Sequence, residues 1–302
     1  MIITGVGEVH RPATLDEALS YMADHPGARP IAGGTDLLVA LRARGSGGGA
    51  VGGGSAATLV DISGLAELRG IWCERGRLVV GAGTRFTELA ESTVVAGAAS
   101  VLARAAAQVG SVQIRNRATL GGNIVNASPA ADSLPALAVH GAVCVLQSAR
   151  GGERRLGIGG LVTGAYATAA RGDELLVKVE IEDCSAWRSS YIKLARRQAM
   201  AISRLAVAVL MQFEGHSVQD LRLAVGAAFP VPGRVGAAEE VLRGAAYSRD
   251  GARVAGETAA DEMVRVSGVR WSTRYKQPVL AALVERAIRQ CAAEEGIDSW
   301  PE

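Results

Sequence analysis

Two glycine-bearing motifs in this sequence have the composition to hold an oxygen-rich anion against the main chain. The first is GGTD at residues 33–36, between a short apolar segment and an expected helix, and the second is GGN at residues 121–123. Glycine has no Cβ, so a ligand can approach the backbone amides, and the positive end of a helix dipole favours negative charge. Each motif alone is equally typical of a tight turn that requires a positive φ.

Together, the two motifs favour a diphosphate held between two chain segments that are far apart in the sequence. Asp132 follows the second motif at the start of an apolar segment, where its carboxylate is placed to accept from ribose hydroxyls. A Rossmann-type dinucleotide site fits less well, because Phe86 stands where the third glycine after Gly81 and Gly83 should be. These two glycines are therefore expected to be turn residues.

A third glycine-rich segment, GSGGGAVGGG at residues 45–54, contains seven glycines. Ordering such a segment costs much backbone entropy, and it lacks the Lys and Ser/Thr that complete a P-loop. We expect a flexible surface loop there.

The bulk composition limits the class of protein. The chain has 302 residues, 49% of them hydrophobic, which is enough for two domains with separate cores. Its 32 basic and 30 acidic residues are spread along the chain, without the basic block that binding to nucleic acid or anionic lipid requires. No apolar run reaches the roughly 18 residues of a membrane span, and the N-terminus lacks the pattern of a secretory signal. A cytoplasmic protein is expected.

The cysteines and histidines do not form a metal-ligand pattern. Cys73, Cys144, Cys184 and Cys291 are far apart, without a C-x-x-C pair, and the four histidines are equally scattered. The cysteines are expected to be small buried hydrophobes, and a metal site built by this chain alone is not expected.

The first half of the chain alternates between short strands and helices. Thr14 and Glu17 fit a capping box before an amphipathic helix, and a strand at 29–32, a glycine turn and a helix from about Asp36 follow. Further strands are expected at 58–62 and 142–149, a hairpin at 70–83, and helices from Thr84 and over 100–109. Alternation in ELLVKVEIE (174–182) predicts one apolar side formed by Leu175, Val177, Val179 and Ile181.

The pattern changes after residue 188. Apolar residues at period two over 205–213, a Glu-Gly turn and a returning run over 221–225 indicate an antiparallel meander. Helical patterns follow, ending with a long helix from about Ser272 to Glu295. The expected fold is α+β, with one domain over 1–183 and a second, sheet-plus-helices domain over 188–295.

Three motifs in this framework resemble a known family. AGGTD at 32–36, QIRNRATLGGNIVNASPAAD at 113–132 and YIKLARR at 191–197 resemble the FAD-binding medium subunit of the molybdenum hydroxylases. That group includes xanthine, carbon monoxide, nicotinate and aldehyde dehydrogenases. The resemblance covers nearly the whole chain and implies a FAD-binding domain of the PCMH type, followed by a C-terminal domain of the carbon monoxide dehydrogenase flavoprotein type.

The resemblance also implies a set of FAD-binding residues. Residues 31–37 and 119–123 would hold the pyrophosphate through main-chain amides and the hydroxyls of Thr35 and Thr119; Asp132 would bind the ribose or adenine side, and Lys193 would lie near the flavin ring. For Val109, Ile114 and Leu176 plain core packing is an equal alternative, and Lys193 could simply be solvated. The implied set is Ile31, Ala32, Gly33, Gly34, Thr35, Asp36, Leu37, Val109, Ile114, Thr119, Gly121, Gly122, Asn123, Asp132, Leu176 and Lys193.

The function implied by the resemblance is electron transfer. FAD on this chain would accept electrons from an iron–sulfur [2Fe-2S] small subunit and pass them to NAD+ or another acceptor, while a molybdopterin-bearing large subunit would act on the organic substrate. No side chain of this chain is expected to serve as nucleophile or general base. Two alternatives stay open: a self-contained FAD oxidoreductase with its own substrate pocket, and a non-catalytic flavin-binding module.

Overall fold

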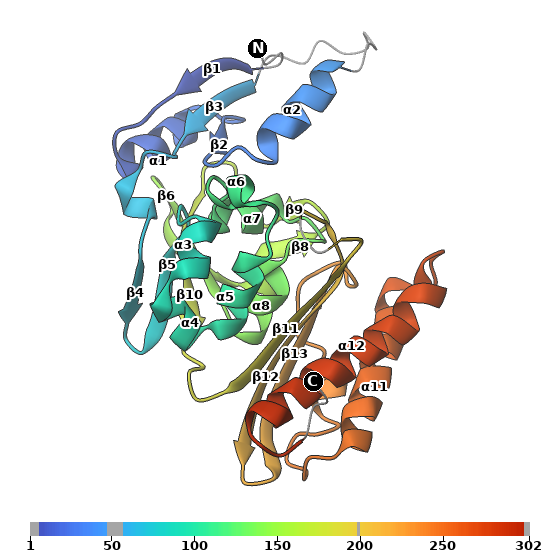
Figure 1. The fold of residues 1–302 in the computed structure, drawn as a ribbon. Helices are drawn as coiled ribbons and strands as arrows, with labels where there is room; N and C mark the ends of the chain where they lie inside the picture. Colours follow the sequence, from blue (N-terminus) through green and yellow to red (C-terminus); the bar gives the residue numbers. More distant parts are fainter. Residues whose placement is uncertain (1–5, 47–56, 198–199, 299–302) are drawn as a thin grey trace.

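The computed structural model describes residues 6–46, 57–197 and 200–298 (Figure 1). The expected flexible loop lies outside the described residues from residue 47 onward. Among the described residues, no helix is long and apolar enough to cross a membrane.

The N-terminal segment forms a small parallel sheet whose successive strands are connected by helices. Its strands pair in the order β1-β3-β2. The elements are β1 (Val6–His10), α1 (Leu15–Asp24), β2 (Arg29–Ile31), α2 (Leu37–Ser46) and β3 (Ala57–Asp61). Because the strands are parallel, their carboxyl ends meet at one edge, which is where ligands bind in open α/β sheets.

The predicted capping of α1 is confirmed with one difference. The Thr14 hydroxyl accepts from the Glu17 amide at 3.2 Å, as expected. The Glu17 carboxylate, however, accepts from the Ala13 amide at 2.7 Å rather than from that of Thr14. The helix buries Leu19 and Met22, so the amphipathic interpretation is correct.

A five-stranded antiparallel sheet forms the middle of the chain, in the order β4-β5-β10-β6-β7. Its strands are β4 (Ile71–Glu74), β5 (Arg77–Gly81), β6 (Val143–Ser148), β7 (Gly152–Gly157) and β10 (Leu175–Glu182). The predicted single apolar side of 175–182 is wrong. The register of β10 against β6 shifts between Leu176 and Lys178, so Val177 packs towards α1 while Val179 packs on the opposite face. Such a bulge moves later side chains to the other face of the strand.

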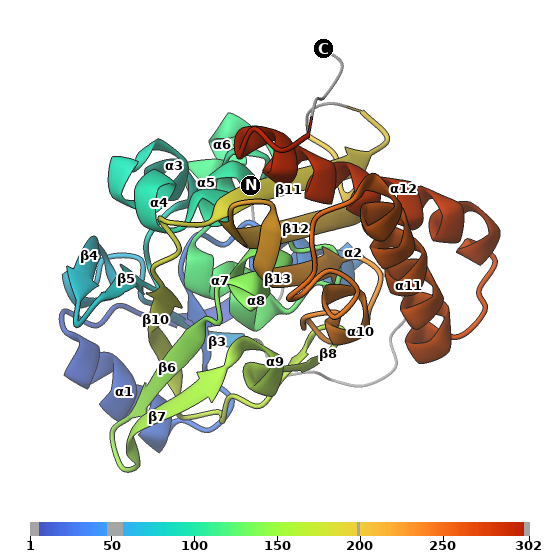
Figure 2. The same cartoon turned by 90° about the horizontal axis from the view of Figure 1, so that it is seen from below.

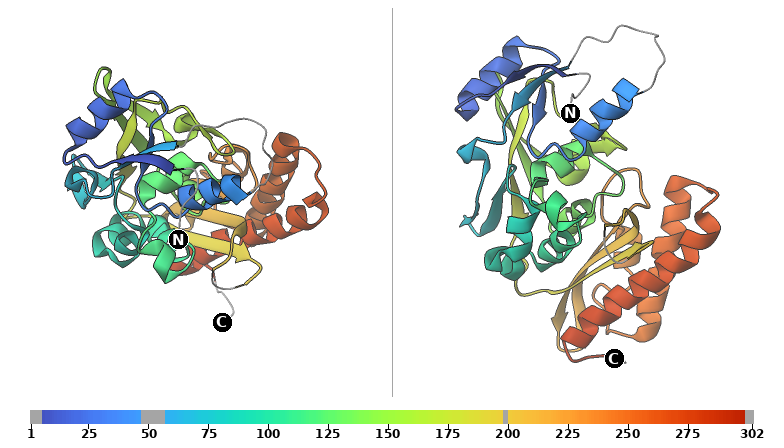
Figure 3. Two further views of the ribbon diagram at one scale, coloured as in Figure 1. Left: turned by 90° about the horizontal axis from the view of Figure 1, so that it is seen from above. Right: turned by 45° about the horizontal axis from the view of Figure 1, so that its top comes forward.

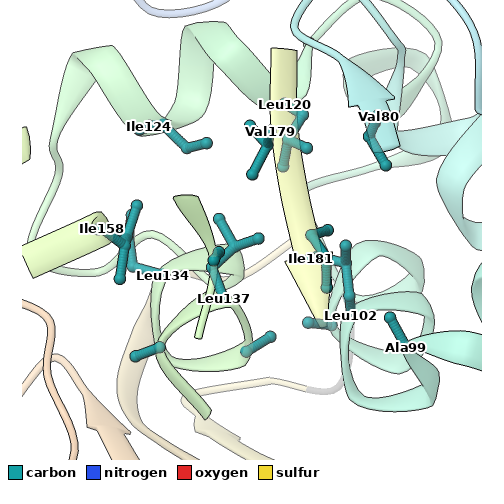
Figure 4. Close-up of a cluster of buried hydrophobic side chains, with 14 of the residues drawn as sticks. Val80, Ala99, Leu102, Leu120, Ile124, Leu134, Leu137, Ile158, Val179 and Ile181 are labelled. Carbon is teal, nitrogen blue, oxygen red and sulfur yellow. The ribbon is translucent and has the colours of Figure 1, made fainter. Parts of the chain in front are cut away.

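Short helices cover one face of this sheet. They are α3 (Phe86–Glu91), α4 (Thr93–Ala98), α5 (Ser100–Ala107), α6 (Val112–Arg115), α7 (Leu120–Asn126), α8 (Ser133–Val139) and α9 (Ile158–Leu161), with the small hairpin β8 (Val162–Gly164) and β9 (Ala167–Thr168). The short helix η1 (Ala66–Leu68) packs instead with α1 on the other face. Figure 4 shows the core between them, where Leu120 and Ile124 of α7 face Val179 of β10. Burial of this core fixes α7 against the sheet.

The C-terminal segment is the predicted meander with helices on its outer face. It comprises β11 (Arg188–Ala195), β12 (Ser203–Glu214), β13 (Ser217–Gly226), α10 (Gly236–Glu239), α11 (Arg249–Ser267) and α12 (Thr273–Glu294). Leu205, Val207 and Val209 share a core with residues of α11 and α12, as the period-two pattern indicated. Figure 2 shows the two helices beside this sheet. The last helix was predicted to within one residue at each end.

The meander is buried on both faces. The alternate residues Ala206, Ala208 and Leu210 of β12 belong to the core shared with α5 and α8. Small side chains at two of these positions let the helices approach the sheet closely. Figure 3 shows that the parallel sheet β1-β3-β2 and the α11–α12 pair lie at opposite ends of the molecule, on either side of this core.

The cysteine prediction is correct for three positions. Cys144, Cys184 and Cys291 are buried, whereas Cys73 on the outer strand β4 is exposed. The exposure of Cys73 could not be predicted from alternation, because the edge strand β4 has only four residues. All four cysteines are free thiols.

Candidate functional site

The first glycine motif connects β2 to α2 at the carboxyl edge of the parallel sheet. Residues 32–36 lie in neither element, and their five amides donate no hydrogen bond to any residue that the structure describes. Gly34 has a φ of +72°, and its carbonyl accepts from the Leu38 amide at 3.1 Å. The motif is therefore both the predicted positive-φ turn and a row of unpaired donors in front of a helix.

This row of amides borders a concave surface. Ala32, Gly33 and Gly34 line a cavity of about 400 Å³. The lining also includes Arg117, Arg11 and Asp61, together with residues of β1 and β3. A cavity at the carboxyl ends of parallel strands, with open amides beside it, is suited to an anionic group.

Gly33 brings the two motifs together. A Cβ on this residue would collide with the carbonyl of Arg117 and lie 3.0 Å from the Cα of Ala118. Only glycine lets these two backbone segments touch without moving one of them. The predicted convergence of two distant chain segments is thus present in the fold, with Arg117 at the contact.

The second glycine motif is not the loop that was expected. Gly121 and Gly122 belong to the first turn of α7, with Thr119 as the N-cap. The Gly121 amide donates to Ala82 O at 2.8 Å, and the Gly122 amide donates to Thr119 Oγ1 at 3.1 Å. The amides of Leu120 and Asn123 are paired as well, so this motif offers a ligand the Thr119 hydroxyl and an exposed surface at Gly122 rather than free amides. Local sequence suggested a loop because glycine weakens helices, but the cap and packing override this.

The two glycines of α7 have different surroundings. Gly121 is buried, and a Cβ there would lie 2.7 Å from the Cβ of Ala82, so its absence of a side chain serves packing. Gly122 is exposed, and a Cβ there would approach only Thr119 Oγ1, at 2.9 Å. Bare backbone is therefore presented to the outside at Gly122 alone.

Arg117 is a candidate that the sequence interpretation missed. Its exposed side chain lines the same cavity as the unpaired amides and makes no ion pair with the described part of the chain. An unpaired guanidinium offers planar, two-pronged donors to phosphate oxygens. The residue lies inside the motif QIRNRATLGGN, and that position was the available signal.

Asp132 and Lys193 form a buried ion pair between the N-terminal and C-terminal parts of the chain. Lys193 Nζ lies 2.7 Å from Asp132 Oδ2, and each side chain is 8% exposed. The hydroxyls of Ser203 and Tyr191 both donate to Asp132 Oδ1, at 2.5 and 3.2 Å. The alternative that Lys193 is merely solvated is therefore wrong, since both charges are buried and paired.

The same cluster reaches neighbouring elements. Lys193 Nζ also donates to Gln108 O at 2.8 Å, beside Val109. Burial and then the neighbouring Asp132 carboxylate hold the pKa of Tyr191 well above its usual range, so its hydroxyl stays protonated as a donor. Tyr191 lies in the motif YIKLARR together with Lys193, but nothing in the sequence indicated that Ser203 belongs to this group.

Ser133 connects this cluster to α7. Its hydroxyl donates to Asn123 Oδ1 at 2.6 Å, which joins the starts of α8 and α7. The two sets of predicted site residues, around the glycine turn and around Asp132, are thus linked through one short helix.

The three apolar candidates differ in burial. Val109 and Leu176 are 9% and 6% exposed and belong to the central core, in accord with the packing alternative. Ile114 is 38% exposed on α6, where it packs over Gly110. Core packing therefore does not account for Ile114.

Comparison with known proteins identifies the family. Residues 5–181 match the model for the FAD binding domain in molybdopterin dehydrogenase, and residues 190–291 match that for the CO dehydrogenase flavoprotein C-terminal domain. The chain belongs to this family of FAD-binding dehydrogenase subunits. It is therefore an oxidoreductase subunit of the molybdenum hydroxylase type, and the resemblance seen in the sequence is confirmed.

Curated relatives align over almost their full length. A xanthine dehydrogenase FAD-binding subunit of Escherichia coli O157:H7 is 32% identical over 95% of this chain and 96% of its own. The carbon monoxide dehydrogenase medium chain of Hydrogenophaga pseudoflava is 26% identical over 93% of this chain and 95% of its own.

Solved structures share the fold. A carbon monoxide dehydrogenase from Hydrogenophaga pseudoflava, in a form lacking the Mo-pyranopterin moiety of its molybdenum cofactor, superposes with a TM-score of 0.85 at 28% identity, covering 97% of this chain and 99% of that one. Quinoline 2-oxidoreductase from Pseudomonas putida 86 gives 0.86 at 27% identity, covering 98% and 99%. The predicted α+β class is confirmed.

Proposed function

We propose that this FAD-binding subunit takes electrons from a [2Fe-2S] partner subunit and delivers them through FAD to NAD+ or another acceptor. The observation that carries the proposal is the row of unpaired amides at residues 32–36, which borders a cavity that Arg117 also lines. FAD supplies the redox chemistry when bound, whereas the protein binds it, orients it and tunes its electrostatic surroundings.

We call the open amides at 32–36, Arg117 and the N-terminal turn of α7 the cradle. The negatively charged diphosphate of FAD is the part of the cofactor suited to it. We assign residues 31–37 and 119–123 to the pyrophosphate, with open amides in the first segment and the Thr119 hydroxyl beside the exposed Gly122 in the second. Thr119 Oγ1 accepts from the Gly122 amide and so keeps its own hydrogen for an anion. The Thr35 hydroxyl and the Arg117 guanidinium add further donors.

The Asp132–Lys193 pair suits a position beside the rest of the cofactor. Asp132 Oδ1 already accepts from two hydroxyls, which leaves Oδ2 as the oxygen with room for a hydroxyl of the cofactor. Because Lys193 contacts this oxygen, both residues would serve the same half of the cofactor. Lys193 uses two of its three donors on Asp132 and Gln108, so one remains for the flavin ring. A cation there would favour negative charge on that ring. Val109, Ile114 and Leu176 would contact the cofactor through apolar surface.

The partners in this proposal are an iron–sulfur small subunit and a molybdopterin large subunit. The relatives named medium chain, FAD-binding subunit or FAD-subunit support an assembly of several chains. Substrate hydroxylation would then belong to the large subunit, and no residue of this chain is assigned to it. The four free thiols support work in a reducing compartment such as the cytoplasm.

Anaerobic titration with NADH tests the proposed electron exchange. The purified, FAD-loaded chain should lose its flavin absorbance as NADH is added, because electrons flow between nicotinamide and bound flavin. The same titration with dithionite is the control that the flavin is reducible at all.

The titration separates the alternatives. Bleaching by dithionite but not by NADH would remove NAD+ as the acceptor and favour another one. Bleaching by a small organic substrate without any other chain present would favour a self-contained FAD oxidoreductase, and flavin inert to both nicotinamide and partner subunits would favour a non-catalytic module.

A further inference from the structure

The loop between α11 and α12 exposes a cluster of large apolar side chains. We define the Trp271 patch as Val266, Val269, Trp271 and Tyr275, which are 45%, 83%, 94% and 47% exposed. The loop lies at the upper right of Figure 1, at the free end of the helix pair. Apolar side chains gathered in this way on a surface indicate a contact with another macromolecule.

The patch is surrounded by uncompensated positive charge. Arg204, Arg270, Arg274 and Lys276 make no ion pair with the described residues. The Arg204 guanidinium instead lies 5.7 Å from the centre of the Tyr275 ring. Burial, and then the nearby Arg270 and Arg204, lower the pKa of Lys276.

Elsewhere on the same helix pair arginines are neutralised. On α11, Arg253 pairs with Asp250 and Glu257, and Arg265 pairs with Glu262. The absence of such partners around Trp271, among the described residues, is thus a local feature. Carboxylates brought by another molecule would supply the missing charge.

The patch adjoins the candidate site by two short routes. Lys276 Nζ donates to Ala227 O at 2.7 Å, and the Ala227 amide donates to Pro129 O at 2.9 Å, in the segment that leads to Asp132. Arg204, which stacks on Tyr275, directly follows Ser203, whose hydroxyl binds the Asp132 carboxylate. The edge of the patch at Tyr275 and Lys276 is therefore connected to the Asp132 cluster through residues in direct contact.

We propose that the Trp271 patch is the docking surface for the electron-donating iron–sulfur partner, which presents an apolar pocket edged by carboxylates. This inference rests on the proposed function. A protein fits the patch better than a nucleotide does. The exposed Val266 and Val269 offer a nucleotide neither a hydrogen bond nor a stacking surface. Tryptophan and arginine, in contrast, are typical anchors at the centre of protein interfaces. The connection of the patch to the Asp132 cluster, where the proposed function places the cofactor, favours the subunit that must deliver electrons.

Replacement of Trp271 tests the docking surface. In source cells, a tagged chain carrying Trp271→Ala should purify with full FAD but with about thirtyfold weaker retention of the iron–sulfur subunit, the effect of losing one anchor residue. The readouts are flavin per chain and iron per flavin. Trp72→Ala, at a 37% exposed tryptophan on β4, is the matched control and should leave both ratios unchanged.

The two ratios keep the docking inference and the proposed function apart. If iron per flavin in Trp271→Ala equals that of the wild type, the docking surface is wrong while the proposed function stands. If the wild-type chain purifies with FAD but never with iron, the proposed electron donor itself is wrong, and the docking inference fails with it.

Photo-crosslinking identifies the occupant directly. With p-benzoylphenylalanine in place of Trp271, irradiation of the assembled complex should join this chain to the iron–sulfur subunit. A crosslink to the molybdopterin subunit, to nucleic acid or to a second copy of this chain would overturn the assignment. Charge reversal at Arg270 and Arg274 to Glu should weaken the complex most at low salt, since screening removes the electrostatic part of the attraction.

Discussion

At the scale of single residues, four glycines in the two motifs perform different tasks that their identity alone does not reveal. Gly33 allows two backbone segments to touch, Gly34 adopts a positive φ, Gly121 packs against Ala82, and Gly122 leaves an open surface. Gly121 and Gly122 are neighbours in the same motif and look alike in the sequence. In the fold, only Gly122 is exposed and can face a ligand. Substitution can therefore separate packing from ligand approach.

A valine at Gly122 should reduce FAD affinity at least about tenfold, because a side chain there occupies the approach to the cradle. Folding should be little affected, since valine is a better helix former than glycine and meets only the Thr119 hydroxyl. Gly97→Val, at an exposed glycine of α4 with no atom within 4 Å, is the control. FAD titration and thermal melting measure the two effects; unchanged FAD affinity in Gly122→Val would remove this residue from the site.

Methionine at Arg117 should weaken FAD about tenfold at low salt, because one charge-assisted contact to the diphosphate is lost. The difference from the wild type should shrink as salt rises. Arg75→Met, in the turn between β4 and β5, provides the same chemical change away from the cavity. If both variants bind FAD equally well, the guanidinium of Arg117 does not contact the cofactor.

Asparagine at Asp132 should cost about 3 kcal/mol of unfolding free energy, because it leaves the buried Lys193 cation without its partner. Adding Lys193→Met should recover part of that loss. Urea denaturation is the measurement, and Asp24→Asn, in the exposed pair with Arg150, should cost less than about 1 kcal/mol. Equal losses in the two single variants would show that the Asp132–Lys193 pair is not buried in solution.

At the scale of elements, the periodicity of apolar residues predicted which side chains face the core wherever one regular pattern runs through the whole element. The apolar stripe of α12 and the alternating large apolar residues of β12 and β13 lie as expected, because together they form one continuous core between the sheet and the helices. The pattern failed at β10, where a bulge shifts the register, and at α7, where tertiary packing and a threonine cap turn a glycine-rich segment into a helix. Neither cause is local to the residues concerned.

The junction of α8, β10 and β13 contains a histidine that makes stability depend on pH. His140 at the end of α8 is fully buried, and neither ring nitrogen has a hydrogen-bond partner in the described chain. Burial, and then the Arg222 guanidinium, lower the pKa of His140 from 6.5 to about 4. The neutral ring therefore favours the fold above pH 6.5, and this contribution is lost as pH falls towards 4.

Between pH 7 and pH 5, the wild-type chain should lose about 2 kcal/mol of stability through His140. His140→Leu, which keeps the volume without the titrating group, should lose correspondingly less over the same range. Urea unfolding at the two pH values measures the difference. Equal pH dependence in both proteins would show that His140 is charged, or hydrated, in the folded state.

At the scale of the whole molecule, the candidate site connects the N-terminal parallel sheet with the C-terminal meander. The cradle is formed where the parallel sheet ends, and the Asp132–Lys193 pair ties it to the meander, which is buried on both faces. The motifs in the sequence predicted which segments would meet. They did not predict that Tyr191 and Ser203 would complete the cluster, because hydroxyls in strands carry no signal of their distant partners.

The central claim is that the open amides at residues 32–36 and the N-terminus of α7 close on the diphosphate of FAD. Isothermal titration of the purified, flavin-stripped chain with FAD, and with riboflavin as the ligand without phosphate, tests it most directly. The account predicts one FAD bound per chain and much weaker binding of riboflavin. A folded chain that takes up no FAD, or binds riboflavin as tightly, would contradict it.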